Sequence, residues 1–238
     1  MYRARALCGR EGDHTLDYAV GLPDDFATIP SMDECRLNGK RLQPVWIAVA
    51  LLVSCGAHAQ VEVVFTASTF VDEWDTKTYQ AVWEEYGDRI VAALEARTCM
   101  PFSEPTVAAT VAEARSHSGG PEHPMRLRAS YPRRIKQSTL VHELGHRHLW
   151  QLEERLDDVD GHMTLYLILD RVWADVWGEA FAEDRIEGES GWHTRYAEAW
   201  AWARSLGSER RLQLWNQLLA MNGFSASCES LVGGASSS

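Results

Sequence analysis

Hydrophobic and polar positions repeat with two different periods in the first part of the chain. Residues 61–65 are mostly β-branched, and residues 125–131 alternate between apolar and polar side chains, as a strand with one buried face does. A further strand is expected within 106–115. Residues 75–96 instead repeat apolar side chains every three or four positions, the spacing of an amphipathic helix. These patterns predict a small N-terminal sheet with one helix.

The second part of the chain has the helical period almost throughout. Helices are expected over 138–154, 162–187 and 193–221, and Gly207 is a candidate break within the last of them. The helix at 162–187 is apolar nearly all round at its start, so it is expected to be central and buried. The fold class predicted is therefore α+β, a small sheet followed by a helical half.

A short apolar run near the N-terminus resembles a secretory signal. Residues 45–53 follow Lys40 and Arg41 and precede Ala57-His58-Ala59, which gives a basic segment, an apolar segment and a small-x-small cleavage site. We place the signal at about 32–59. Cys55 alternatively fits a bacterial lipobox, which would anchor the protein to a membrane by a lipid. A third interpretation is a buried strand or short helix of the domain itself.

These features divide the chain into three parts. Residues 1–59 are expected to be an N-terminal extension with the signal, 60–232 one domain, and 233–238 a flexible tail rich in Ser and Gly. Residues 1–31 are either a mis-assigned start or a real extension. The domain is expected to be exported, to the periplasm or the medium.

Composition narrows the class of function. Lys and Arg total 23 against 34 Asp and Glu, a formal net charge of −11, which argues against a nucleic-acid partner. No apolar run reaches the roughly 18 residues of a membrane-spanning helix. Ten Trp residues predict a core with large aromatic side chains. Cys99 and Cys228 would remain after signal removal, as a disulfide or as two buried thiols.

One motif carries the candidate chemistry. His142-Glu143-Leu144-Gly145-His146 lies within the predicted helix 138–154, where Ser138 or Thr139 could cap the helix start. Residues four apart project from the same face of a helix, so two imidazoles can hold one zinc ion. Zinc lowers the pKa of a water it binds to about 7, and Glu143 can act on that water as a general base. His148 is expected on the surface.

This motif resembles the HExxH helix of the zincin metallopeptidases. The resemblance covers the segment from about Met125 to the end of the helix at 162–187, and it implies a zinc-dependent hydrolase of peptide or protein substrates. The alternating strand at 125–131 would offer an edge where an extended peptide could pair. Arg147 and His148 depart from the usual pattern after the second ligand. The metzincin extension is absent, since Leu149 and Leu152 occupy its positions.

Three residues compete as the third metal ligand. Gly161-His162 is similar to the arrangement of SprT-like zincins, in which a His at nearly this spacing begins the next helix. Asp170 is a charged side chain in an apolar run and could ligate the metal, orient a ligand His, or pair with an Arg. Glu179 resembles the glutamate of gluzincins. The order of preference is His162, Asp170, Glu179.

Two functions from different classes follow. The first is an exported zinc metallopeptidase, with His142, His146 and His162 as ligands and Glu143 as the catalytic base. The alternative is a non-catalytic exported or lipid-anchored binding protein, in which the motif is incidental or holds a structural metal. Substrate specificity and oligomeric state are not encoded in any pattern identified above.

Overall fold

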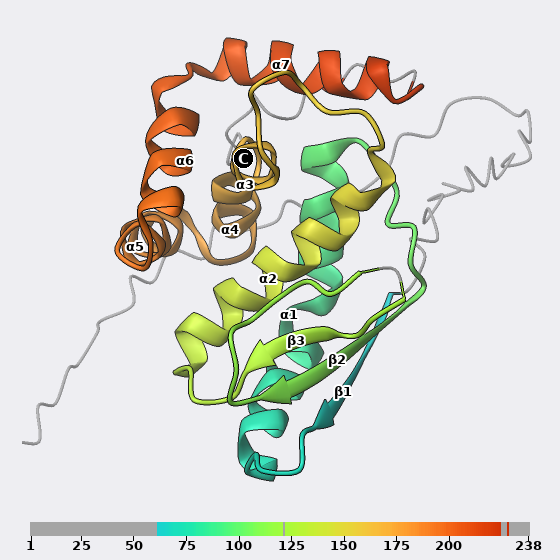
Figure 1. The fold of residues 1–238 in the computed structure, drawn as a ribbon, viewed down its shortest axis with the longest axis vertical. Coiled ribbons are helices and arrows are strands. Elements are labelled where there is room, and N and C mark those ends of the chain that lie inside the picture. Colours follow the sequence, from blue (N-terminus) through green and yellow to red (C-terminus); the bar gives the residue numbers. More distant parts are fainter. Residues whose placement is uncertain (1–60, 121, 225–227, 229–238) are drawn as a thin grey trace, which may run out of the picture. The chain divides into compact units, whose positions relative to one another are not determined.

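The computed structural model describes residues 61–120, 122–224 and 228 (Figure 1). The predicted signal and the possible lipid anchor at Cys55 lie outside these residues. Strands β1 (Glu62–Ala67), β2 (Thr106–Ala112) and β3 (Met125–Arg128) form one sheet in the order β1-β2-β3. All neighbouring strands are parallel, and helix α1 (Glu73–Thr98) connects β1 to β2.

The sheet buries one face against helices. Alternate strand residues are buried, among them Val63, Phe65, Val107, Val111 and Leu127, while their neighbours in the strands are mostly exposed. This alternation confirms the one-sided strands predicted from the sequence. In α1, Tyr79, Val82, Ile90 and Leu94 are fully buried, as the helical spacing predicted. The helix is capped by Asp72, whose side chain accepts a hydrogen bond from the backbone N–H of Trp74.

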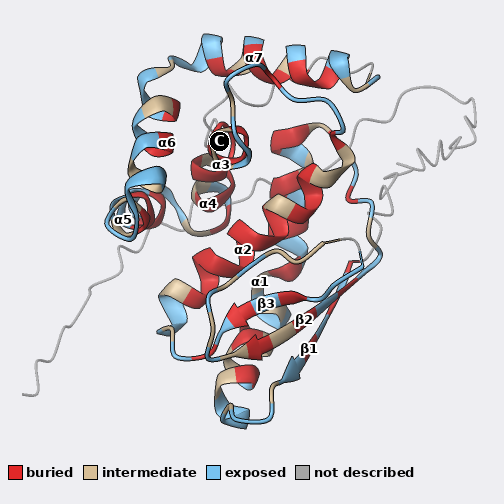
Figure 2. Cartoon of the chain, viewed as in Figure 1, coloured by how far each residue is buried: buried red, intermediate tan, exposed pale blue. Residues whose placement is uncertain are grey.

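The rest of the described chain is helical, which confirms the α+β class. It begins with α2 (Arg133–His148) and a 3₁₀ turn (Leu149–Gln151). Five further helices follow in chain order: α3 (Gly161–Tyr166), α4 (Leu169–Trp177), α5 (Glu179–Ser190), α6 (Thr194–Ser205) and α7 (Ser208–Met221). Figure 2 shows that α2 is buried over most of its length, since it lies between the sheet and the other helices.

Several predicted helix boundaries are wrong. Helix α2 begins at Arg133 because Pro132, with its fixed backbone angle, precedes it, and Ser138 lies inside the helix rather than at its cap. The single helix expected over 162–187 is three helices. Gly178 separates α4 from α5 with φ 90°, a conformation that favours glycine. The expected break at Gly207 is confirmed, between α6 and α7.

Large aromatic side chains fill the core, as the tryptophan content predicted. Trp173, Trp200 and Trp215 are fully buried, and the ring of Trp200 stacks on Tyr166 with centroids 3.9 Å apart. Trp74 and Trp192 are exposed instead. Among the described residues, no helix has the length and apolar character needed to cross a membrane.

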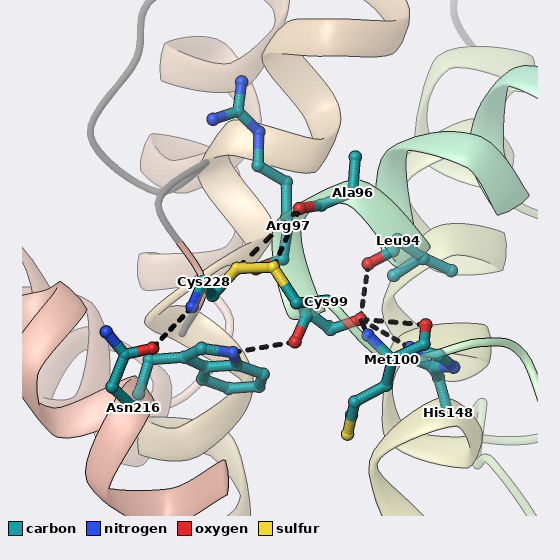
Figure 3. The surroundings of a disulfide bond; sticks show 10 residues. Leu94, Ala96, Arg97, Cys99, Met100, His148, Asn216 and Cys228 are labelled. Atoms are coloured by element: carbon teal, nitrogen blue, oxygen red, sulfur yellow. Dashed lines mark hydrogen bonds between the residues drawn. A yellow bond between two sulfur atoms is a disulfide. The ribbon is translucent and has the colours of Figure 1, made fainter. Parts of the chain in front are cut away.

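A disulfide joins the end of α1 to the C-terminal part of the chain (Figure 3). Cys99 and Cys228 are bonded, with Cα atoms 5.6 Å apart, so the disulfide alternative is the one the structure shows. Beside it, the carbonyl of Thr98 accepts a hydrogen bond from Trp215 Nε1 at 3.0 Å, and the Thr98 hydroxyl lies 2.7 Å from His148 Nε2. The ends of α1 and α2 are thereby connected to each other and to the middle of α7.

Candidate metal centre

Three histidines from two helices converge. His142 and His146 project from one face of α2, and His162 is the second residue of α3. One ring nitrogen from each lies within 4.8 Å of the others, close enough to bind one metal ion. The ring centroids of His146 are 4.9 Å from those of both His142 and His162. These are the two ligands predicted from the motif and the preferred candidate for the third.

The chain returns His162 to the motif because α2 ends early. The helix stops at His148, only two residues after His146, and the segment that follows leads back to α3. Asp160 caps α3, since its Oδ1 accepts a hydrogen bond from Met163 N at 2.8 Å. Gly145 allows α3 to approach closely. A Cβ atom there would lie 2.7 Å from Cδ1 of the fully buried Leu165.

Glu189 of α5 fixes the orientation of the first histidine. Its side chain is 1% exposed, and its Oε1 accepts a hydrogen bond from His142 Nδ1 at 3.1 Å. Because a carboxylate only accepts hydrogen bonds, Nδ1 carries the proton and Nε2 remains for a metal. Oε2 of Glu189 accepts from the Tyr166 hydroxyl and from Trp200 Nε1. Glu189 could not be predicted from the sequence, since no spacing distinguishes it from the exposed acids beside it in α5.

Burial keeps the other two histidines neutral. Burial and the neighbouring histidines hold the pKa of His146 well below its ordinary value. Burial, with His142, lowers the pKa of His162 to about 4. For His142, burial acts in the same direction, but the charge of Glu189 and its hydrogen bond outweigh it and raise the pKa. Two of the three imidazoles are therefore neutral at pH 7, each with one unprotonated ring nitrogen, as metal ligands must be.

Glu143 lies beside this cluster in a cavity of about 510 Å³. The lining residues come from α2, from the segments around β3 and from the region between α5 and α6, and include Arg115, Arg128, Tyr131, His142, Glu143, Trp192 and Tyr196. Burial, together with the charge of Glu189, raises the pKa of Glu143 to about 7, although His142 opposes the rise. A carboxyl group with this pKa can exchange a proton near neutral pH.

No family model, curated protein or solved structure matches this chain. The interpretation of the site therefore depends on its geometry and on the chemistry of its side chains.

The two other candidates for the third ligand lie elsewhere. Asp170 is buried in α4, where both of its carboxylate oxygens accept hydrogen bonds from Arg211, at 3.1 and 2.8 Å. Asp170 does not belong to the histidine cluster. The residue that orients a ligand histidine is Glu189, not Asp170. Glu179 is exposed and pairs with Arg171 at 3.0 Å. Both acids are explained by ion pairs rather than by metal binding.

The edge of β3 is not open along its length, contrary to the expectation of peptide pairing there. His117 pairs with Arg126 of β3 through two backbone hydrogen bonds of 2.9 and 2.8 Å, and Ser116 Oγ accepts from the backbone N–H of Arg128. The segment that contains Arg115 and Ser116 therefore runs beside β3, and both residues line the cavity together with Arg128.

His148, expected on the surface, is buried at the end of α2. Its ring stacks on Phe102 with centroids 5.0 Å apart, and burial lowers its pKa to about 4. Because this value lies below the pKa of about 6.5 in the unfolded chain, His148 must take up a proton mainly in the unfolded state as the pH falls. The neutral form therefore stabilises the fold above pH 6.5, and this stability is lost between pH 6.5 and 4.

We expect His148→Gln to flatten the acid dependence of stability. In the metal-free wild type, protonation of His148 should lower the free energy of unfolding by about 3 kcal/mol between pH 6.5 and 4. In the variant, the free energy of unfolding should fall by about 3 kcal/mol less over the same pH range. Urea unfolding at a series of pH values measures this difference. The same acid dependence in both proteins would contradict the burial of a neutral imidazole.

Proposed function

We propose that this chain is an exported, zinc-dependent metallopeptidase of the zincin type, which hydrolyses peptide bonds. The observation that carries the proposal is the convergence of His142, His146 and His162 at one point, where His142 lines the same cavity as Glu143. Two histidines four residues apart on a helix, with a glutamate after the first, form the arrangement that hydrolytic zinc sites use. The likeness to zincins thus rests on the motif and on the third histidine.

The residues of the site fit a zinc ion. The donors are three imidazole nitrogens, a set that suits zinc and other late transition metals better than magnesium or calcium. His142 Nδ1 donates a hydrogen bond to the buried carboxylate of Glu189. Zinc-binding histidines are usually oriented by a hydrogen bond of this kind. When bound, Zn²⁺ supplies a Lewis acid and lowers the pKa of a water molecule to about 7.

The protein's own groups provide the proton transfer. We assign Glu143 the role of general base, which takes a proton from water and delivers it to the leaving amine. Its pKa, raised to about 7 mainly by burial, allows both steps near neutral pH. Glu189 keeps the His142 ring in place through the Nδ1 hydrogen bond. Tyr196, whose ring centroid is 4.7 Å from that of His162, lines the cavity and is a candidate donor to the carbonyl oxygen of a substrate.

Export is part of the proposal. The disulfide between Cys99 and Cys228 supports it, because such bonds form and persist in oxidising compartments. The signal expected at about 32–59 supplies the route. Mass spectrometry of the secreted or periplasmic protein would show whether the mature chain begins at Gln60 or at a lipid-modified Cys55.

Metal analysis tests the function directly. We expect about one zinc per chain after purification without chelators, and loss of that zinc in His146→Ala. His123→Ala, an exposed histidine outside the cluster, is the matched control and should retain it. Chelation should stop hydrolysis of a mixture of fluorescence-quenched peptides, and added zinc should restore it. Protein without zinc contradicts the proposal, and bound zinc without hydrolysis favours the non-catalytic binding protein.

A further inference from the structure

One arginine at the cavity has no partner in the described part of the chain. Arg115 is exposed and lines the cavity that Glu143 also lines, and its guanidinium makes no hydrogen bond or ion pair with any residue of 61–120, 122–224 or 228. Every other arginine in these ranges makes at least one such contact. A guanidinium at the wall of a cavity that forms no ion pair of its own can bind an anion such as a carboxylate.

The backbone of Arg115 is held in place. Its carbonyl accepts a hydrogen bond from Arg126 Nε at 2.8 Å, and the two residues that follow it are bonded to β3. Further along the same segment, the buried Arg147 of α2 donates to the carbonyls of Ser118 and His123, at 2.9 and 3.1 Å. The guanidinium of Arg115 is therefore carried by a fixed segment, which lowers the entropy cost of binding a ligand.

Arg128 adds a second positive charge to the same cavity. Its guanidinium lies 5.5 Å from the ring centroid of Tyr131, and Tyr131 stacks on Trp192 with centroids 5.6 Å apart. Both aromatic residues line the cavity. Arg128 Nε donates a hydrogen bond to Ser130 Oγ at 3.2 Å and forms a half-exposed ion pair with Glu113 at 3.8 Å, which solvent screens. The cavity thus combines two arginines with an aromatic pair.

The carboxylates of the cavity do not neutralise these arginines. Glu189 is buried and already accepts hydrogen bonds from His142, Tyr166 and Trp200. Glu143 is also buried, at the histidine cluster. Arg115 lines the same cavity as Tyr196, a candidate donor to the substrate carbonyl.

We propose that Arg115 and Arg128 form a subsite for a carboxylate of the substrate, so that the protein selects acidic peptides. The inference rests on the proposed function for its placement beside a scissile bond. The carboxylate can come from an Asp or Glu side chain or from the free C-terminus of a peptide, and the chemistry of recognition is the same. Selection of acidic peptides is notable in a chain of net charge −11, because overall repulsion must be overcome locally.

The test measures binding rather than hydrolysis. Zinc-loaded, full-length Glu143→Gln protein is immobilised and incubated with an equimolar mixture of three peptide pools that contain only uncharged residues outside one central position. The first pool has a central Glu and an amidated C-terminus, the second a central Gln and an amidated C-terminus, and the third a central Gln and a free C-terminus. Mass spectrometry gives the retention of each pool relative to the second.

We expect at least one carboxylate pool to be retained about fivefold over the neutral pool, the ratio typical of an ion pair at a partly exposed site. Enrichment of the first pool identifies an acidic side chain as the ligand, and enrichment of the third identifies the C-terminus. The enrichment should fall when salt is raised from 0.1 to about 0.5 M, because exposed charges are screened. Equal retention of all three pools overturns the subsite.

Variants locate the preference. In the same background, Arg115→Gln should remove most of the enrichment, and Arg128→Gln should reduce it. Arg210→Gln makes the same change in net charge at an exposed position on α7 and should leave the enrichment unchanged. Enrichment that survives both cavity variants contradicts the proposal.

The outcomes for the subsite and for the function are separable. Enrichment that depends on Arg115, in a protein whose wild type hydrolyses nothing, retains the subsite and overturns the peptidase. If the wild type hydrolyses peptides but binding shows no carboxylate preference, the peptidase is retained and the subsite is overturned.

Discussion

Glu143→Gln should lower the rate of peptide hydrolysis by about 10²–10⁴-fold, the contribution of a positioned general base. Gln keeps the size of the side chain but cannot take a proton from water. The three histidines are unchanged, so zinc content should remain about one per chain. Hydrolysis of quenched peptides and metal analysis on the same preparations measure both quantities.

The matched control for this variant is Glu153→Gln, which removes one negative charge at an exposed position after the 3₁₀ turn. It should hydrolyse peptides at the wild-type rate. If Glu143→Gln retained full activity with its zinc, another group would have to be the base. If it lost zinc as well as activity, Glu143 would act on the metal site rather than on the proton transfer.

Glu189→Ala should be the most destabilising single change near the site. It removes the acceptor shared by His142 Nδ1, the Tyr166 hydroxyl and Trp200 Nε1, all within 3.2 Å. Breaking a buried, hydrogen-bonded charge in this way lowers the free energy of unfolding by about 3–5 kcal/mol. The His142 ring also loses its orientation, and zinc affinity should fall by about 10–100-fold.

Urea unfolding of the metal-free protein and competition with a zinc chelator measure the two effects separately. Glu187→Ala, an exposed glutamate on the same helix, should change neither. Glu189→Gln keeps the volume and provides a folded protein if the alanine variant does not fold. It should still weaken zinc binding, because an amide lacks the charge of the carboxylate. Unchanged zinc affinity in Glu189→Gln would contradict a ligand-orienting role.

Local periodicity was sufficient to predict the strands and α1, because each buries one regular face. The same signal failed at 162–187. Residues from Leu165 to Leu169 are all buried, so their apolar run carries no information about a helix break. Gly178 did mark such a break, but a glycine within a helical pattern is common enough that its positive φ could not be inferred from sequence.

The candidate site was predictable where it depends on one helix and unpredictable where it depends on packing. His142 and His146 share a face through helix geometry alone. To predict the position of His162 from helix lengths, one would have to know where α2 ends. It ends at His148, and Leu149 and Leu152 after it are buried in the core. Resemblance to a known spacing was what placed His162 first among the three candidates. Glu189 comes from a distant helix, so no local pattern marks it.

The glycine inside the motif gives the site a particular vulnerability. Because a side chain at Gly145 would meet Leu165, the distance between the helix that supplies two ligands and the helix that supplies the third is set by one absent methyl group. Substitution by Ala would force Leu165 to repack or α3 to move back. For the proposed zinc site, one mutational step at this glycine would therefore be enough to end metal binding in a whole lineage of such proteins.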